Sequence, residues 1–387
     1  IGHKENSSGN YHISLVEGLR LAGYTVDYSL IKAHPRVQET TSPWLLQGKQ
    51  KKVEEFIPED KDLASQVLAN DIALIVLGHV GGEGSDRTKS EFYLTEREKE
   101  LVSKVTEAYH AVGKKVIVLL NIPGAIEMES WKDIPDAILC IYQGGEQFGN
   151  YVADVLKGTV TPSGKLTVTF AKDLMDYPSS KNFPVLDEEF GMRGMAAGAQ
   201  GFTRKDKMTT DGTRNVDYTV YEEGIYVGYR YFDTFNVDVT YPFGYGLSYT
   251  TFEYSKPTII KNDDEFIISV MIKNSGEYDG REIVQLYVTA PKGKLDKPKK
   301  ELKAFAKTKT LIPGESETLV MRVKAEDLAS FNSDKSQWET DKGEYTFLIG
   351  ASVADIKASL KGSVDQAYTK KVRDVLEPPM AINELKP

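Results

Sequence analysis

The hydrophobic positions of the first 175 residues follow two alternating patterns. Short, mostly apolar runs rich in β-branched residues lie at 72–77, 116–121, 137–142 and 166–170. Runs of this length are typical of strands buried on both faces of a parallel sheet. Helical spacing and capping residues, among them a capping box of Thr95 with Glu98, predict helices over 13–22, 95–112 and 146–156, and a short strand is expected at 24–26. The alternation favours an α/β fold with a mostly parallel sheet sandwiched by helices.

From residue 252 onward the pattern changes to short strands with turn residues between them. The predicted strands lie at 265–272, 281–289, 300–309, 315–323 and 345–351. Alternating strands at this spacing favour a β-sandwich of the immunoglobulin or fibronectin type III kind.

One carboxylate stands out in the loop after the strand at 72–77. Gly81, Gly82 and Gly84 surround Glu83, and Asp86 and Arg87 follow. Working loops of α/β sheets lie beyond the carboxyl ends of the strands, and glycines let such a loop extend from the sheet. A solvated connection without chemistry remains the alternative, since short motifs match by chance.

Composition narrows the class of protein. The 387 residues suggest two or three domains, and the net charge of −9 argues against a nucleic-acid partner or an anionic membrane. No apolar run approaches the roughly 20 residues of a membrane span. A single cysteine, Cys140, rules out an internal disulfide. The sequence starts at Ile1 rather than Met, so we expect a processed or truncated piece of a longer protein.

No cofactor or metal is expected. The glycine loop lacks the G-x-G-x-x-G spacing and the P-loop lysine, which argues against a nucleotide-binding domain. The histidines have no metal-ligand spacing; they are His3, His12, His34, His79 and His110.

Four separated segments together resemble glycoside hydrolase family 3. The first is Gly82–Arg87, and the second is the strand at 116–121 with Glu127 after it. The third spans 144–166 and includes Pro162-Ser163-Gly164-Lys165-Leu166. The fourth joins Gly224-Ile225-Tyr226-Val227-Gly228-Tyr229-Arg230-Tyr231-Phe232-Asp233 to Pro242-Phe243-Gly244-Tyr245-Gly246-Leu247-Ser248-Tyr249. The chain thus resembles the C-terminal part of the three-domain β-glucosidases of that family.

This resemblance implies a domain organisation. The family combines a (β/α) barrel with an α/β sandwich and a fibronectin type III-like domain, and the barrel is not in this chain. Residues 1–175 would form the α/β sandwich, 176–249 a linker and insertion with the tyrosine-rich motif, 250–365 the fibronectin type III-like domain and 366–387 a C-terminal tail.

It also implies a chemistry. The family's nucleophile is an aspartate on the barrel, and the matching position for its general acid/base is Glu83. The expected activity is that of a retaining exo-β-glycosidase, in particular a β-glucosidase that releases terminal β-D-glucosyl residues by double displacement. Asp86 and Arg87 would support the loop by an ion pair or contact the sugar.

The implied partners are a β-linked gluco-oligosaccharide or aryl glucoside and the barrel, from the same precursor or a second chain. The resemblance leaves a homodimer open, and a periplasmic or secreted location would suit a polysaccharide-degrading enzyme. The alternatives are a β-xylosidase of the same family and a carbohydrate-binding accessory module. Because one carboxylate cannot perform double displacement, we expect this chain alone to be inactive.

Overall fold

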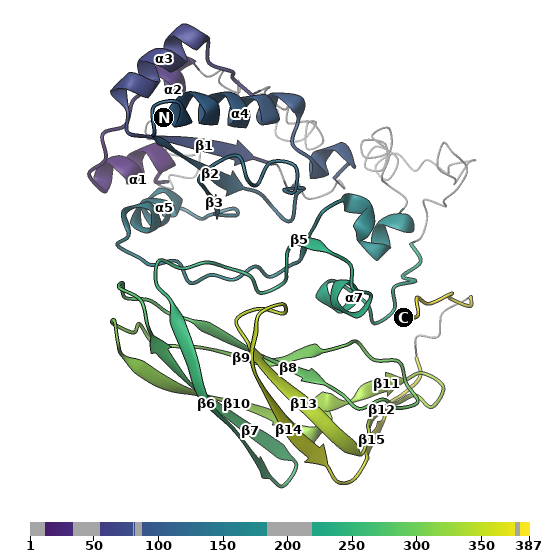
Figure 1. Ribbon diagram of the computed structural model, residues 1–387. Coiled ribbons are helices and arrows are strands. Elements are labelled where there is room, and N and C mark those ends of the chain that lie inside the picture. Colours follow the sequence, from purple (N-terminus) through teal and green to yellow (C-terminus); the bar gives the residue numbers. More distant parts are fainter. Residues whose placement is uncertain (1–11, 34–54, 80, 82–86, 184–218, 376–379) are drawn as a thin grey trace, which may run out of the picture. The chain divides into compact units, whose positions relative to one another are not determined.

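The computed structural model describes residues 12–33, 55–79, 81, 87–183, 219–375 and 380–387 (Figure 1). The chain divides into two compact units. The first consists of residues 1–157, 172–174 and 183–219, and the second of residues 158–171, 175–182 and 220–387. The division expected near residue 175 therefore differs from the units found, because much of the segment 158–182 belongs to the second.

A parallel sheet forms the centre of the first unit. Its strands are β1 (Ile72–Gly78), β2 (Lys115–Asn121) and β3 (Ala137–Cys140), in the order β1-β2-β3. Both pairings are parallel, with Ile75 opposite Val118 and Val118 opposite Ile138. The carboxyl ends of the strands therefore meet at one edge, where the chain continues to His79 and Ile122.

Burial in this sheet depends on the position of each strand. Val118, Leu119 and Leu120 of the central strand β2 are fully buried. In β1, Ile75 and Leu77 are buried, whereas Val76 on the other face is 42% exposed. The prediction that β1 is buried on both faces is therefore wrong, because the described part of the chain covers only the face that carries Ile75 and Leu77.

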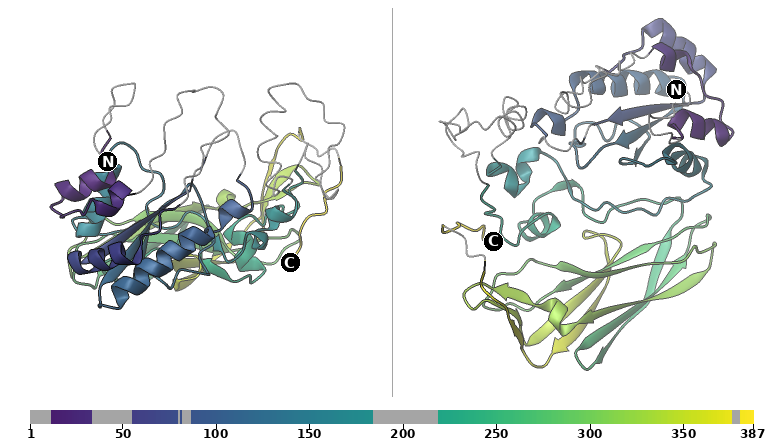
Figure 2. Two further views of the ribbon diagram at one scale, coloured as in Figure 1. Left: turned by 90° about the horizontal axis from the view of Figure 1, so that it is seen from above. Right: turned by 180° about the vertical axis from the view of Figure 1, so that it is seen from behind.

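Helices lie on both sides of the sheet (Figures 1 and 2). On one side α4 (Glu96–His110) packs on β1 and β2, and α3 (Asp60–Ala69) packs on α4. On the other side lie α1 (Leu15–Leu21) and α5 (Phe148–Lys157), while α2 (Ser29–Ala33) precedes residues outside the described part. The predicted parallel sheet sandwiched by helices is confirmed.

Two short predictions in this half are wrong. Residues 24–26 form no strand. The strand expected at 166–170 is reduced to β4 (Phe170–Ala171), which pairs antiparallel with β5 (Val239–Tyr241) in the second unit. Gly164 and Lys165 instead contact residues far along the chain, so local apolar character did not decide their structure.

Helices α1 and α5 cross at two glycines. A Cβ on Gly18 would overlap the backbone of Gly149, and a Cβ on Gly149 would overlap the carbonyl of Ser14. The Ile13 N–H also donates to Glu146 O (2.8 Å). The two backbones approach so closely because neither position carries a side chain.

The second unit is mainly a β-sandwich. One sheet has the order β10-β7-β6, with β6 (Phe252–Asn262), β7 (Glu265–Asn274) and β10 (Ser316–Lys324). The other has the order β14-β13-β8-β9, with β8 (Ile283–Thr289), β9 (Glu301–Lys307), β13 (Gly343–Gly350) and β14 (Ile356–Val364). All these pairings are antiparallel.

Alternating residues of both sheets form its core. On β7 they are Phe266, Ile268, Val270 and Ile272, all fully buried. They belong to one cluster with Leu286, Phe347 and other inward-facing residues. The five predicted strands are confirmed as β7, β8, β9, β10 and β13. Strand β6 was not predicted from the sequence, because it contains Pro257 and has a register shift between Ser255 and Thr258.

A third small sheet completes the unit, with β11 (Ser330–Asn332), β12 (Gln337–Thr340) and β15 (Tyr368–Lys371). β15 pairs antiparallel with β12. The segment 366–387 that the sequence suggested as a tail thus contributes a strand to this unit.

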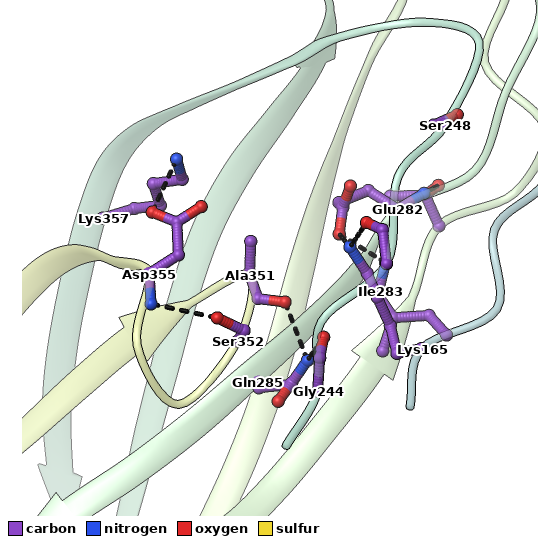
Figure 3. A network of polar contacts seen from close by, with 12 residues as sticks. Lys165, Gly244, Ser248, Glu282, Ile283, Gln285, Ala351, Ser352, Asp355 and Lys357 are labelled. Carbon is purple, nitrogen blue, oxygen red and sulfur yellow. Dashed lines mark hydrogen bonds and ion pairs between the residues drawn. The ribbon is translucent and has the colours of Figure 1, made fainter. Parts of the chain in front are cut away.

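The glycine-rich motif around Gly244 is a scaffold within the second unit (Figure 3). Gly244 has φ +81°, and a Cβ there would overlap the Gln285 side chain. The Gln285 amide donates to Gly244 O (3.1 Å) and Ala351 O (2.8 Å). Close by, Lys165 Nζ lies 3.1 Å from Glu282 Oε1. These contacts attach the chain around residues 165 and 244 to β8.

Part of the tyrosine-rich stretch also belongs to this scaffold. Helix α7 (Tyr229–Thr234) begins with Tyr229, whose ring stacks on Phe243 with centroids 4.8 Å apart. The Tyr229 hydroxyl accepts a hydrogen bond from Leu302 N (2.7 Å). Tyr229 therefore has a packing role in the second unit.

The helix crossing predicts an unusual effect of alanine at Gly149. Glycine to alanine inside a helix usually stabilises by about 1 kcal/mol. Here the added methyl group would force α1 away from α5, so we expect Gly149→Ala to destabilise the chain by about 1–3 kcal/mol in urea unfolding. Gly145→Ala is the matched control, since a Cβ there meets no atom within 4 Å. Equal midpoints for both variants would contradict the close crossing.

Candidate functional site

The expected site residues fall in different parts of the structure. Glu83 and Asp86 lie outside the described residues, whereas Arg87 lies within them. The residues on either side of segment 82–86 are described, and they determine where its ends are held.

His79 is the first residue after β1. Its backbone N–H donates to Asn121 O (3.0 Å), which extends the pairing of β1 with β2 by one residue. Its side chain is buried, and Nδ1 lies 3.2 Å from Glu91 O. Glu91 belongs to a short 3₁₀ helix, η1 (Ser90–Phe92). The start of the loop is thus attached both to the sheet and to η1.

Arg87 attaches the other end. Its Nη2 donates to Glu91 O (2.7 Å), and its Nη1 donates to Ala125 O (3.3 Å). A guanidinium group is suited to this because its donors point in fixed, divergent directions. The carbonyl of Glu91 is therefore a common acceptor for side chains on both sides of segment 82–86.

The turn after β2 is a second common support. A Cβ on Gly81 would overlap the ring of Pro123, so the loop start packs directly on this turn. Arg87 binds the same turn through Ala125 O. Both ends of the segment 82–86 thus rest on η1 and on residues 123–125.

Glu98 completes the arrangement from the first turn of α4. Its Oε2 accepts from Thr95 N (2.6 Å) and Thr95 Oγ1 (2.8 Å), which confirms the predicted capping box. Its Oε1 lies 3.3 Å from His79 Nε2, with both side chains almost fully buried. The geometry of this contact is that of an ion pair rather than a well-aligned hydrogen bond.

The charge of Glu98 is stabilised by its partners. Burial by itself raises the pKa of a carboxyl group, but here the contact with His79 and the hydrogen bonds from Thr95 outweigh it. Together they lower the pKa of Glu98 to about 2. Glu98 is therefore a buried carboxylate at neutral pH.

Two neighbouring polar residues serve local structure. Glu127, which lies in a segment of the family resemblance, accepts from Ser130 N (2.6 Å) and Ser130 Oγ (2.7 Å). The Tyr93 hydroxyl donates to Asp173 Oδ2 (2.8 Å), and burial together with this carboxylate raises the pKa of Tyr93 to about 12. Both side chains thus hold neighbouring parts of the chain together by hydrogen bonds.

Other chemistries find no support in the described part of the chain. Within it, no three His, Cys, Asp or Glu side chains gather closely enough to hold a metal ion. Burial raises the pKa of the Cys140 thiol. None of the described helices combines the length and apolar character needed to cross a membrane.

Sequence reasoning missed His79, Glu91 and Glu98 as parts of this site. The capping box pointed to Glu98, but only for its bond to Thr95. The role of the Glu91 carbonyl has no sequence signal, because any residue supplies a carbonyl oxygen. Only the placement of η1 beside the end of β1 brings these groups together.

The fold defines a class: an α/β sandwich, in which the residues flanking segment 82–86 are held at the carboxyl edge of the sheet, followed by a fibronectin type III-like domain. The family model of the glycosyl hydrolase family 3 C-terminal domain matches residues 3–229. The model of the fibronectin type III-like domain matches residues 282–353. The chain belongs to glycoside hydrolase family 3.

Individual relatives agree with this assignment. A β-glucosidase from Ruminococcus albus is 34% identical over 384 residues, covering 95% of this chain and 36% of the relative. β-Glucosidase 3B from Thermotoga neapolitana, solved in complex with glucose, is 39% identical with a TM-score of 0.78, covering 95% of this chain and 49% of that one. An exo-α-(1→6)-L-arabinopyranosidase from Bifidobacterium longum is 31% identical over 316 residues, covering 80% of this chain and 37% of the relative. The chain thus spans between about a third and a half of their lengths.

The lowered pKa of Glu98 predicts how stability depends on pH. Its folded pKa of about 2 lies below the ordinary value of 4.5 for a glutamate, so the carboxylate stabilises the fold above pH 4.5 and this contribution is lost as pH falls toward 2. We expect Glu98→Gln to cost about 1–3 kcal/mol at pH 7 in urea unfolding and progressively less between pH 4.5 and pH 2.

Glu96→Gln is the control for this experiment, since its side chain is 90% exposed and pairs only at the surface with Lys99. A loss for Glu98→Gln that does not change with pH would contradict the role of its charge.

Proposed function

We propose that the complete protein is a retaining exo-β-glycosidase, in particular a β-glucosidase, and that Glu83 is its general acid/base. The membership of the chain in glycoside hydrolase family 3 and relatives named β-glucosidase support this activity. The anchored ends of segment 82–86 support the role of Glu83, because the arrangement holds both flanks of this carboxylate at the carboxyl edge of the sheet.

The chemistry requires two carboxyl groups. In a retaining glycosidase they lie about 5–5.5 Å apart; one attacks the anomeric carbon, and the other protonates the leaving oxygen and later deprotonates water. In our proposal Glu83 is the second group, and the nucleophile is an aspartate on a barrel domain outside these 387 residues. The negative charge of that aspartate would help Glu83 to keep its proton near neutral pH.

Asp86 and Arg87 support the loop in this proposal. Arg87 donates to two backbone carbonyls, and this favours a structural role over sugar binding. We propose that Asp86 completes the loop by pairing with the Arg87 guanidinium.

The substrate in this proposal is a β-linked gluco-oligosaccharide or aryl glucoside. A β-xylosidase is the second candidate, since sugar choice would be set mainly by the barrel. The similarity to an arabinopyranosidase supports the view that this part of the family serves more than one sugar. A carbohydrate-binding accessory module would follow if the chain acts without a barrel.

The acid/base role predicts a dependence on the leaving group. In the complete protein, Glu83→Ala should lower kcat/KM for phenyl β-D-glucoside at least about 100-fold, because a poor leaving group needs protonation. For 2,4-dinitrophenyl β-D-glucoside kcat/KM should change little, and azide should restore turnover by replacing water as nucleophile. Glu100→Ala, at an exposed position of α4, is the control. Unchanged kinetics for Glu83→Ala would refute the role.

The missing nucleophile predicts that the 387-residue chain is inactive by itself. Purified alone, it should not hydrolyse 2,4-dinitrophenyl β-D-glucoside above the rate in buffer. Turnover that survives repurification would mean that the nucleophile lies within this chain.

A further inference from the structure

We propose that His79 is a positioning residue for Glu83, acting through its Nδ1 contact with the Glu91 carbonyl and oriented by Glu98. The inference rests on the proposed acid/base role of Glu83. It assigns a function to a buried ion pair that neither the capping of α4 nor the pairing of β1 with β2 requires.

The side chain of His79 is held from two directions. Nδ1 lies 3.2 Å from Glu91 O, and Nε2 lies 3.3 Å from Glu98 Oε1. Both partners are acceptors: Glu91 O lies within hydrogen-bond distance of Nδ1, whereas Glu98 Oε1 and Nε2 are in close contact without an aligned hydrogen bond. Glu98 is itself fixed by two hydrogen bonds from Thr95, so the orientation of the imidazole follows from the start of α4.

The contact matters because of what else binds the same carbonyl. Arg87 Nη2 donates to Glu91 O (2.7 Å) from the other side of segment 82–86. With Gly81 and Arg87 held, five residues separate the two anchored ends, and Glu83 is the second of them. A shift of η1 would therefore move the end of segment 82–86 next to Arg87 relative to the end that follows β1.

The size of the effect follows from the sensitivity of catalysis to geometry. A misplacement of about 1 Å can cost about 100-fold in rate, even when it originates away from the reacting atoms. A structural role alone would act differently, because a less stable protein loses activity on every substrate in the same proportion.

Two conservative variants separate the contacts of the ring. The side-chain amide of asparagine can replace Nδ1, and the longer glutamine can replace Nε2. His79→Asn therefore keeps a donor for Glu91 O, whereas His79→Gln keeps a donor for Glu98. The measurement is kcat/KM of the complete protein for phenyl and for 2,4-dinitrophenyl β-D-glucoside, with the unfolding temperature of each variant determined alongside.

We expect His79→Gln to lower the ratio of kcat/KM for the phenyl substrate to kcat/KM for the 2,4-dinitrophenyl substrate at least about tenfold. The reason is that only the phenyl substrate needs the proton. His79→Asn should keep the ratio within about threefold of the unsubstituted protein. Arg87→Lys, which retains the charge but cannot bind two carbonyls in the same way, should reproduce the effect of His79→Gln from the other anchor. This variant leaves the buried ion pair intact, so it tests the anchoring even if both His79 variants fold poorly.

Other outcomes would overturn the proposal. An unchanged ratio in His79→Gln and Arg87→Lys, or an equal loss on both substrates, would reduce the pair to a structural role. A selective loss in His79→Asn as large as in His79→Gln would exclude the route through Glu91. Glu83→Ala separates failure of the proposed function from failure of the positioning role. If Glu83→Ala shows no leaving-group dependence, the proposed function fails. If Glu83→Ala alone shows this dependence, only the positioning role of His79 fails.

Discussion

The carbonyl oxygen of Glu91 receives His79 and Arg87, which flank segment 82–86 on opposite sides. This convergence depends on the parallel sheet. Because β1 and β2 run in the same direction, the residue after β1 and the turn after β2 meet at one edge. His79 and Arg87, which flank the five-residue segment, are thus held on a backbone carbonyl. Side-chain substitutions elsewhere in the loop would not change this acceptor.

The buried pair of His79 and Glu98 is costly in free energy. Charges removed from water lose several kcal/mol of hydration, and a pair of apolar side chains of similar volume would often be as stable. Stability alone therefore gives no reason for these residues at this place. In the proposal above, the contact of His79 with the carbonyl that also receives Arg87 provides one.

In the second unit, a side chain likewise binds backbone carbonyls and holds loop segments in place. The polar network around Gln285 attaches loop segments to the β-sandwich. Gln285 reaches two carbonyls from separate loops, and Gly244 leaves room for its side chain. The motif that is most specific for the family in this region is therefore explained by packing and backbone hydrogen bonds.

Elements with strong periodicity could be predicted from the amino-acid pattern alone, among them the buried strands of the sheet, the capped helix α4 and the five regular strands of the sandwich. In these, local preference and burial point to the same structure. The sequence also singled out Glu83, Asp86 and Arg87, through glycine spacing and family resemblance.

Features that depend on partners far along the chain became visible only in the folded structure. Val76 is half-exposed because no described element covers its face of β1, and residues 164–166 join the second unit because their hydrogen-bond partners lie near residue 245. Likewise, no pattern near His79 reveals Glu91 and Glu98 as its partners. Periodicity reports which side of an element is apolar, whereas a contact between backbone carbonyls and side chains depends on where the chain returns in space.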